Sequence, residues 1–389
     1  MYEELLSKHV SEIKPSGIRK FFDLANEMEG VISLGVGEPD FTTPWHICEA
    51  AIYSIESGRT HYTANQGLLE LREEICAYQK RRFNLTYDPV KNVVVTVGGS
   101  EAIDIAMRAI VNPGDEVILM EPSYVAYTPS VELVGAIPVH IRLEHKDQFK
   151  LTPEKLEAAI TPKTKAMLLN FPSNPTGGVM TKEDYEKLVP IIKKHNILII
   201  SDEIYAELTY EGEFYSLANF KEIKDQVILI SGFSKAYAMT GWRLGYVLAH
   251  ETFTNAMNKI HQYIIMSAPT AAQYGAIEAL RNGDIHVQEM KESYMARRNF
   301  ITKGFNRLGL PTHLPQGAFY IFPDIRMSGL TSDEFCEQLL EQQKVACVPG
   351  TAFGDAGEGF IRVSYAYSIE HIREALERID VFMNTFRQK

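Results

Sequence analysis

Five short apolar runs constrain the fold of this chain more than any other feature. They span residues 93–97, 116–120, 166–169, 197–200 and 227–230. The runs lack regular alternation of polar and apolar residues, so we expect strands that are buried on both faces of a parallel sheet. The segments between them are longer and amphipathic; in 182–196, for example, Leu188 and Ile192 recur on one helical face. This pattern predicts an α/β layered domain.

The chain beyond about residue 285 follows a different pattern. We expect, in order, a long polar helix, a glycine-marked strand at 317–322, a helix at 332–343, a strand at 360–364 and a closing helix. This order predicts a smaller α+β unit. With 389 residues, 45% of them hydrophobic, the chain can fill two cores. The predicted division is an N-terminal arm with part of the small domain at 1–44, a large domain at 45–280 and a small C-terminal domain at 281–389.

Composition and charge exclude several classes of protein. The formal net charge is -11, from 39 basic and 50 acidic residues, which argues against a general binder of nucleic acids or of anionic membranes. The four cysteines have neither metal-ligand nor redox spacing, so we expect reduced thiols and no metal site. The sequence contains no apolar segment long enough to span a membrane and no signal-peptide core at its N-terminus. We therefore expect a soluble, cytoplasmic protein.

Lys235 follows the fifth apolar run, in the segment Ser231-Gly232-Phe233-Ser234-Lys235. An unpaired ammonium group is costly to bury, so a lysine is out of place as a structural residue at the end of a buried strand. An amine whose pKa is lowered by its surroundings can instead form a Schiff base. Ser234 and Arg243 lie close by in the sequence and would suit a phosphate-bearing cofactor. A lysine that reaches solvent beside a paired Arg243 is the alternative interpretation.

Polar segments follow the other four runs as well. The first run ends in glycines and Ser100, which direct backbone N–H groups at an anion or form a tight turn with Ser100 as a helix N-cap. Tyr124 follows the second run and either stacks on a flat ligand or packs as a surface tyrosine. Asn174 follows the third run, in a turn-forming segment that offers an amide group. Asp202 ends the fourth run, where a buried carboxylate needs a partner, and Tyr205 lies three residues on.

The five polar segments are expected to meet, because ligands of open α/β sheets bind outside the carboxyl ends of the strands. Together they supply an amine, a carboxylate, a phenol, an amide, an aromatic ring and an anion-binding turn. Pyridoxal 5'-phosphate needs these groups: a Schiff-base lysine, an acid for its ring nitrogen, partners for O3', a stacking face and phosphate donors. The convergence predicts this cofactor, although each segment alone has a structural interpretation.

The sequence that carries these residues resembles the fold-type-I pyridoxal-phosphate enzymes, in particular the class I aminotransferases of the aspartate aminotransferase superfamily. The resemblance runs from about Ile13 to Val381. Its markers are the segments 33–41, 174–177, 201–205, 234–235 and 362–365, with Tyr62 and Arg243. It implies a large domain with a mostly parallel seven-stranded sheet that binds the cofactor, a smaller α+β domain, and aminotransferase activity.

The resemblance also implies roles for individual residues around the cofactor. Lys235 would bind the cofactor covalently and act in catalysis together with Asp202 and Tyr205. Asp202 would pair with the pyridine nitrogen, and Asn174 and Tyr205 would contact O3'. Tyr124 would stack on the ring. The phosphate would be bound by Ser234 and Arg243 and by the backbone at Gly99 and Ser100, with Ser231 as a weaker candidate.

Further implied roles concern the substrate and a second subunit. Arg362 would hold the substrate α-carboxylate as a bidentate fork, whereas from the sequence alone it reads as an ordinary surface-pair arginine in a strand. Gly37, Ile18 and Asn174 would complete the substrate site. Tyr62, otherwise a packing tyrosine, would reach the phosphate of the neighbouring subunit. This last role implies a homodimer with shared active sites.

The choice of amino donor depends on a segment near the mouth of the site. Where some aspartate-specific relatives have a polar residue this chain has Ile18, and Ser100 stands where some of them have a basic residue. Both departures favour an aromatic or other bulky amino acid as donor, with 2-oxoglutarate as a plausible acceptor. Ser16 and Arg19 could serve a distal polar group. N-acetyl-diaminopimelate and aspartate remain alternative donors.

Two other classes share the fold. Carbon–sulfur β-lyases use the same lysine and cofactor, and they stay open as a less favoured alternative. A cofactor-sensing transcription regulator needs an additional DNA-binding segment, for which the N-terminus offers no room, and the net charge is of the wrong sign.

Overall fold

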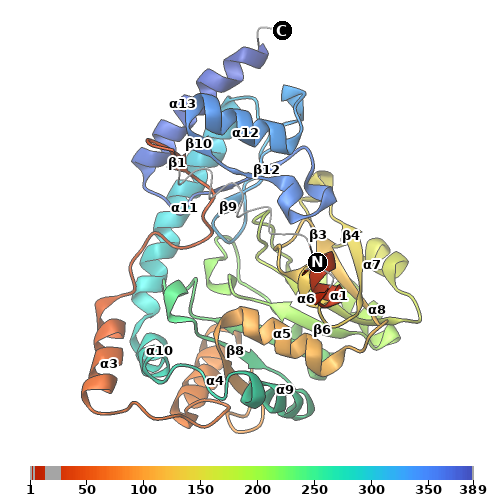
Figure 1. Cartoon of the computed structure of the whole chain (residues 1–389), viewed down its shortest axis with the longest axis vertical. Helices are drawn as coiled ribbons and strands as arrows, with labels where there is room; N and C mark the ends of the chain where they lie inside the picture. The colour runs from red at the N-terminus through yellow and green to blue at the C-terminus, as the bar shows by residue number, and fades with distance from the viewer. Residues whose placement is uncertain (1, 3–4, 14–27, 388–389) are drawn as a thin grey trace.

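The computed structural model describes residue 2 and residues 5–13 and 28–387. Its main feature is a seven-stranded sheet in the order β2-β8-β7-β6-β5-β3-β4 (Figure 1). All strands run parallel except β8, which is antiparallel to both of its neighbours. The strands are β2 (Val93–Thr96), β3 (Glu116–Glu121), β4 (Ile137–Arg142), β5 (Thr164–Asn170), β6 (Leu198–Asp202), β7 (Val227–Gly232) and β8 (Gly245–Leu248). The mostly parallel seven-stranded sheet is therefore confirmed.

The five apolar runs are all strands of this sheet, and two further strands carry no comparable signal. The edge strand β4 reads Ile-Pro-Val-His-Ile-Arg and is partly exposed along most of its length. An edge strand has one open side, so its sequence need not be uniformly apolar. The antiparallel β8 is buried but has only four residues and begins with a glycine. Strands that short are difficult to predict from sequence patterns.

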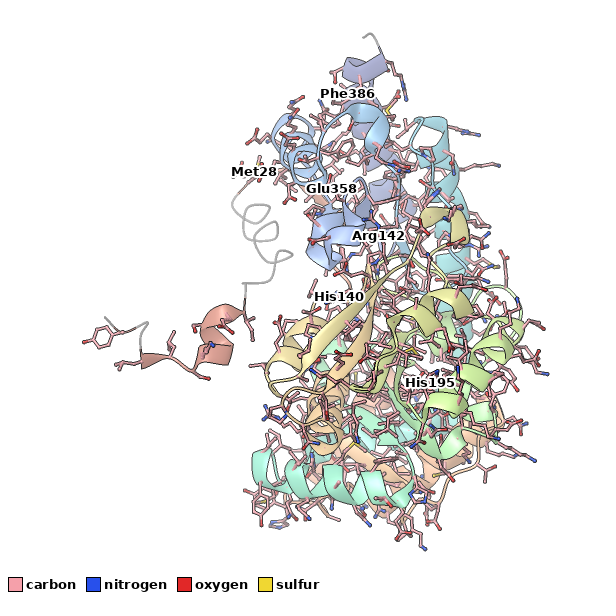
Figure 2. All side chains as sticks on the ribbon, turned by 90° about the vertical axis from the view of Figure 1, so that its right-hand side faces the viewer. Met28, His140, Arg142, His195, Glu358 and Phe386 are labelled. Carbon is pink, nitrogen blue, oxygen red and sulfur yellow. The ribbon has the colours of Figure 1, made fainter. Side chains whose placement is uncertain are left out.

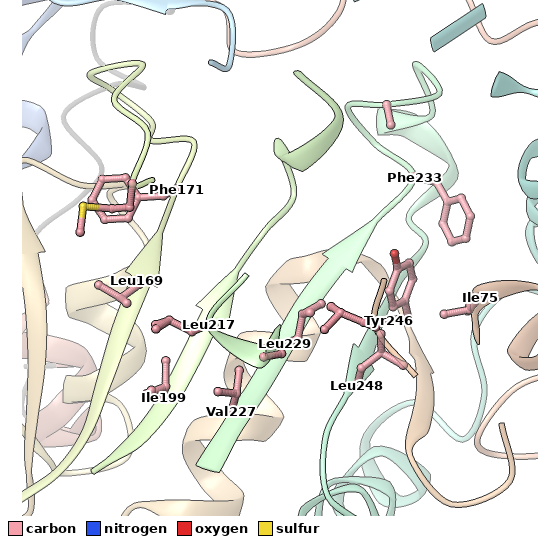
Figure 3. Close-up of a cluster of buried hydrophobic side chains, with 14 of the residues drawn as sticks. Ile75, Leu169, Phe171, Ile199, Leu217, Val227, Leu229, Phe233, Tyr246 and Leu248 are labelled. Carbon is pink, nitrogen blue, oxygen red and sulfur yellow. The ribbon is translucent and has the colours of Figure 1, made fainter. Parts of the chain in front are cut away.

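Helices cover both faces of the sheet, which explains why its strands are apolar throughout. Alternate residues of β7 enter different cores: Ile228 and Ile230 pack with α5 and α9, and Val227 and Leu229 pack with α4, α8 and α10. Figure 3 shows the core around Val227 and Leu229, along several strands of the sheet. The helices of this part of the chain are α3 (Trp45–Glu56), α4 (Leu69–Phe83), α5 (Gly98–Ile110), α6 (Tyr127–Glu132), α7 (Pro153–Ala159), α8 (Lys182–His195), α9 (Glu251–Ile264) and α10 (Thr270–Asn282).

Apart from the two cores that cover the faces of the sheet, the chain after α10 builds a separate core above the edge of the sheet, which we call the second core (Figure 1). The long helix α11 (Asp284–Arg307) joins this part to the sheet, and α12 (Ser332–Gln343) and α13 (Ile369–Arg387) pack together. The strands of this part are β9 (Tyr320–Ile321), β10 (Val345–Ala346), β11 (Val348–Pro349) and β12 (Ile361–Ser364). The expected strand at 317–322 is thus reduced to two residues.

The N-terminal segment contributes to this second core. Strand β1 (Ile32–Ser33) pairs in parallel with β10, whereas α1 (Lys8–Glu12) projects from the body of the protomer (Figure 2). The pairing agrees in position with the expected share of 1–44 in a small domain, and the domain boundaries stay a prediction. Within the described ranges, no helix is both long enough and apolar enough to cross a membrane.

Candidate functional site

A cavity of about 580 Å³ lies at the carboxyl ends of the parallel strands, beneath the second core. Five strand ends contribute to it, as the polar segments of the sequence predict. Of the predicted residues, those that line the cavity are Gly37, Gly99, Ser100, Tyr124, Asn174, Asp202, Tyr205, Ser234, Lys235, Arg243 and Arg362. The structure therefore brings together residues that are more than 300 positions apart, from Gly37 to Arg362.

Lys235 lies just beyond the end of β7, with its amine inside the cavity. The amine donates a hydrogen bond to the carbonyl oxygen of Gly37 over 2.6 Å, and the rings of Tyr205 and Phe319 lie 5.9 and 5.8 Å away. Burial disfavours the charged form and lowers the pKa of Lys235 from 10.5 to about 8. A substantial fraction of this amine is therefore uncharged at the pH of a cell, as a nucleophile or a general base requires.

This pKa can be tested without any substrate. In the cofactor-free protein, acylation of Lys235 by acetic anhydride should reach half of its maximal rate near pH 8, since only the neutral amine reacts. The same residue in urea-unfolded protein should reach it near the ordinary lysine value of 10.5. Peptide mass spectrometry of samples labelled between pH 6 and 11 measures both curves. Coincident curves would contradict the structural cause of the shift.

Asp202 ends β6 as a buried carboxylate that faces the cavity. Its Oδ2 accepts a hydrogen bond from the Tyr127 hydroxyl over 2.7 Å, and its Oδ1 accepts one from the backbone N–H of Ile204 over 3.2 Å. Burial raises the pKa of Asp202. No lysine, arginine or histidine in the described part of the chain forms an ion pair with it. A cationic group inside the cavity would supply the missing partner.

Tyr127 was missed by the sequence analysis, although it lies only three residues beyond Tyr124. Tyr127 is the first residue of α6, and its side chain lines the cavity. Tyr124 itself lines the cavity, and the two rings meet edge to face with their centroids 5.5 Å apart. Tyr127 therefore supports both the carboxylate of Asp202 and the candidate stacking residue.

Asn174 and Tyr205 present an amide and a phenol to the cavity. The backbone N–H of Asn174 donates to the Asn170 side chain over 3.0 Å, and the Asn170 amide donates to the carbonyl oxygen of Asp202 over 3.0 Å. Asn170, which also lines the cavity, was not identified from the sequence. Its bonds fasten the end of β5 to the end of β6, so the Asn174 turn and the Asp202 carboxylate hold a fixed relative position.

One end of the cavity, formed by α5 and Arg243, is the candidate anion-binding end. Helix α5 begins at Gly98 with Val97 as N-cap, so the interpretation of Ser100 as the N-cap is wrong, and Gly99 and Ser100 lie in the first turn. The N–H groups of a first helical turn have no partners within the helix. Arg243 packs against this turn: a Cβ atom at Gly98 would lie 2.8 Å from its guanidinium. The glycine therefore permits a close approach of the cation.

Two serines near Lys235 differ in position. Ser234 lines the cavity. The hydroxyl of Ser231, within β7, donates instead to the carbonyl oxygen of Glu203 over 3.4 Å, and this residue does not line the cavity. Ser231 thus lies away from the anion-binding end, whereas Ser234 remains a candidate for it.

Arg362, on β12, is 2% exposed and projects into the cavity from the second core. Its guanidinium donates to Asn174 Oδ1 over 3.0 Å and to the carbonyl oxygen of Gly35. The rings of Tyr320 and Phe353 flank it, with centroids 4.6 and 4.9 Å from its central carbon. Its Nε is buried without a partner. A buried guanidinium paired with no carboxylate among the described residues is no surface-pair arginine, and it suits an anionic ligand.

Two predicted site residues are not among those that line the cavity in the described part of the chain. The Tyr62 side chain is 80% exposed and does not line the cavity of this chain. Ile18, together with Ser16 and Arg19, lies outside the described residues. Sequence reasoning also missed Glu38 and Tyr320, which line the cavity. Glu38 is part of the 33–41 marker segment, whereas Tyr320 had no signal beyond its place in an expected strand.

Comparisons with known proteins agree with this geometry. A model of the family "Aminotransferase class I and II" matches residues 29–379. The putative aminotransferase YugH of Bacillus subtilis is 55% identical over 97% of this chain and 98% of its own length. Aromatic-amino-acid aminotransferase 2 of Thermococcus litoralis is 42% identical over 96% and 97%, and a probable N-acetyl-LL-diaminopimelate aminotransferase of Bacillus subtilis is 42% identical over 98% and 96%.

A solved structure is similar over nearly the whole chain as well. Thermus thermophilus aspartate aminotransferase with maleate superposes with a TM-score of 0.92, at 38% identity, over 97% of this chain and 99% of its own. The residues that line the cavity fit the family's cofactor. The buried acid without a cation, the lysine amine and the first turn of α5 beside Arg243 match the ring nitrogen, aldehyde and phosphate of pyridoxal 5'-phosphate.

Proposed function

The chain belongs to the class I and II aminotransferases, which use pyridoxal 5'-phosphate, and we propose that its amino donor is an L-amino acid with an aromatic or other bulky side chain. The acceptor is a 2-oxo acid such as 2-oxoglutarate. The observation that carries this proposal is the distribution of charge in the cavity. Among the described lining residues the cations are Lys235, Arg243 and Arg362, and each already has a place in a reaction on a monocarboxylate.

The cofactor would be bound by groups that the cavity presents together. Arg243, Ser234 and the N–H groups of Gly99 and Ser100 bind its phosphate. Asp202 binds the ring nitrogen, and Tyr124 covers a face of the ring. The Tyr205 phenol and the Asn174 amide, which both line the cavity, would hold its hydroxyl O3'. These assignments use the remaining hydrogen-bonding capacity of residues whose positions are fixed by Tyr127 and Asn170.

Lys235 and Arg362 would act on the amino acid. When bound, pyridoxal 5'-phosphate supplies an electron sink that makes the Cα proton of an amino acid removable. Lys235 would first accept this proton at its Nζ and later in the reaction donate it again. A pKa of about 8 is suitable for both steps. Arg362 fixes the α-carboxylate and thereby places Cα near Lys235. Asp202 keeps a proton on the ring nitrogen by its negative charge.

The rest of the cavity wall supports an uncharged donor side chain. Val36, Ile103 and Val125 line it beside Tyr124, and Glu38 adds a negative charge. A distal carboxylate, as in aspartate or in the acceptor 2-oxoglutarate, would meet no further cation among the described lining residues, so its partner would have to be Arg19, which the sequence offers for a distal polar group and which lies outside the described residues. Burial of an unpaired carboxylate is costly, whereas an aromatic side chain gains from contact with apolar walls. N-acetyl-diaminopimelate is the second candidate, because a relative with that name is as similar as the aromatic-amino-acid enzyme.

A screen of amino donors against 2-oxoglutarate tests the proposed substrate class. Phenylalanine and tyrosine should give a kcat/KM at least about 10-fold above that of aspartate, which corresponds to the cost of one poorly paired carboxylate. N-acetyl-diaminopimelate belongs in the same screen. A clear preference for aspartate would contradict the proposal. Release of pyruvate and ammonia from cystathionine would instead favour the carbon–sulfur lyase alternative.

The active site is proposed to be completed by a second copy of the chain. Tyr62 and the residues 263–266 form an exposed apolar patch, with exposed fractions of 80% at Tyr62 and 84% at Tyr263. Two hydrogen bonds hold these segments side by side: Asn65 donates to the carbonyl oxygen of Met266, and Thr270 donates to that of His61. Exposed patches of this kind are typical of subunit interfaces. In a homodimer, Tyr62 would reach the cofactor phosphate of the partner.

Two variants separate assembly from phosphate binding. Tyr263→Glu should convert a dimer to a monomer in sedimentation analysis, because it buries a charge in the interface. Tyr62→Phe should leave the dimer intact and weaken retention of pyridoxal 5'-phosphate about 10- to 100-fold, as expected for one hydrogen bond to a charged group. A monomeric, fully active wild-type protein would contradict the shared site.

A further inference from the structure

Tyr320 lies between Tyr205, which is proposed to contact the cofactor, and Arg362, which is proposed to bind the substrate carboxylate. It is fully buried in β9, and its residue partner on β12 is Ser364, two positions from Arg362 on the same strand. Diagonal neighbours of this kind lie within reach of long side chains. The Tyr320 ring accordingly stacks on the Arg362 guanidinium at 4.6 Å, and its hydroxyl lies 2.8 Å from the Tyr205 hydroxyl.

The backbone at Gly37 is shaped to admit this hydroxyl. A Cβ atom at position 37 would lie 2.7 Å from the Tyr320 hydroxyl oxygen, closer than real Cβ atoms approach. The carbonyl oxygen of Gly37 also accepts the hydrogen bond from Lys235. The Tyr320 hydroxyl therefore packs against the same peptide that holds the amine, so its position is fixed from three directions: Gly37, Tyr205 and Arg362.

We propose that Tyr320 is a positioning residue of this active site, whose hydroxyl orients the Tyr205 hydroxyl and whose ring holds the Arg362 guanidinium. We assign Tyr320 as the donor in the hydrogen bond between the two hydroxyls, which leaves the Tyr205 O–H free to donate into the cavity. The positive charge of Arg362 over the Tyr320 ring draws electron density from that phenol and strengthens it as a donor. The inference rests on the proposed roles of Tyr205 and Arg362.

A purely structural role would use the residue differently. A buried phenol needs a hydrogen-bond partner, and in the described structure the partner of Tyr320 is Tyr205, which follows β6 of the large sheet and lines the cavity. A phenylalanine would fill the same volume and stack on Arg362 without that need. The hydroxyl and the ring therefore make separable contributions, and two substitutions can distinguish them.

The hydroxyl is tested by the colour of the bound cofactor. In the holoenzyme, the pH midpoint of the cofactor's absorbance change should move in Tyr320→Phe in the same direction as in Tyr205→Phe. The expected size is roughly 0.5 to 1 pH unit, the equivalent of one neutral hydrogen bond. The double variant should shift no further than Tyr205→Phe alone, because both substitutions break one chain of hydrogen bonds.

The ring is tested by the affinity of a carboxylate that has no amino group. In the holoenzyme, Tyr320→Phe should bind 3-phenylpropanoate, and acetate as a probe without a side chain, with wild-type Kd. Tyr320→Leu, which removes the face over Arg362, should weaken both about fivefold. Tyr365→Phe is a matched control, since Tyr365 is fully buried in the same core, donates to the carbonyl oxygen of Ala318 and lies outside the cavity. It should change neither readout.

Each outcome bears on a different claim. A midpoint that moves in Tyr205→Phe but stays in Tyr320→Phe would overturn the orienting role and leave the proposed function intact. A midpoint that stays in both variants would remove Tyr205 from the cofactor site, and the inference with it. An unchanged carboxylate Kd in a folded, cofactor-loaded Tyr320→Leu protein would overturn the role of the ring.

Discussion

A Lys235→Ala variant is expected to bind pyridoxal 5'-phosphate and to convert amino acids about 10⁴-fold more slowly than the wild-type chain. Binding persists because Asp202, Arg243 and the first turn of α5 remain in place. Turnover is lost because the variant has no amine to move the Cα proton, a role that contributes up to about 10⁴-fold in enzymes. Single-turnover formation of 2-oxo acid from phenylalanine measures the effect. Wild-type turnover in this variant would contradict the role of Lys235 in moving the Cα proton.

Two comparisons make the loss specific. A small primary amine added to Lys235→Ala should restore part of the rate, since it can enter the space that the side chain leaves and accept the same proton. Lys291→Ala serves as the matched control. Lys291 is a half-buried lysine of α11 whose pKa is also lowered by burial, but it does not line the cavity. Its replacement should leave turnover unchanged, so a lowered pKa alone does not produce the effect.

Replacement of Arg362 by lysine should lower kcat/KM for amino acids by about 10²-fold. Lysine keeps the charge but lacks the planar fork that binds a carboxylate with two hydrogen bonds. Truncation of one partner in a buried, charged hydrogen-bonded pair costs about 2 to 5 kcal/mol, which brackets this factor. The loss should appear mainly in KM, since the carboxylate is held before and during the reaction. Steady-state kinetics with phenylalanine measures it.

A comparison of substrates with and without a carboxylate identifies the cause of the loss in Arg362→Lys. A slow amine substrate without a carboxylate, such as 2-phenylethylamine, should react equally with wild-type protein and Arg362→Lys. Arg298→Lys is the control for general damage, because Arg298 is also buried and stacked on a ring, that of Tyr210 at 5.0 Å, but outside the cavity. Equal losses for phenylalanine and 2-phenylethylamine would show that Arg362 supports the fold rather than the carboxylate.

Much of the sheet could be predicted because parallel strands buried on both faces leave a strong signal. The apolar runs before Asp202 and Lys235 appear as β6 and β7, each lengthened into its polar end. The signal fails where burial is uneven or the strand is short, as in β4 and β8. The location of the cavity followed from the same logic, since parallel strands end at one edge and the unusual polar residues stand at those ends.

The remainder of the site depends on contacts that no local pattern encodes. Tyr127 serves Asp202 from a different strand end, and the stacking of Tyr320 on Arg362 depends on the register of β9 with β12. Arg362 itself has no local signal, and only the family resemblance marked it. The substrate is the least predictable feature, because Ile18 lies outside the described residues and Tyr62 would contribute only in the proposed homodimer.

The central claim is that this cavity is the cofactor site and that Lys235 is its covalent anchor. Borohydride reduction of the holoenzyme, followed by peptide mass spectrometry, tests it most directly. The expected result is one cofactor per chain, attached to the peptide that contains Lys235 and lost in Lys235→Ala. Attachment to any other lysine in an active preparation would contradict the account.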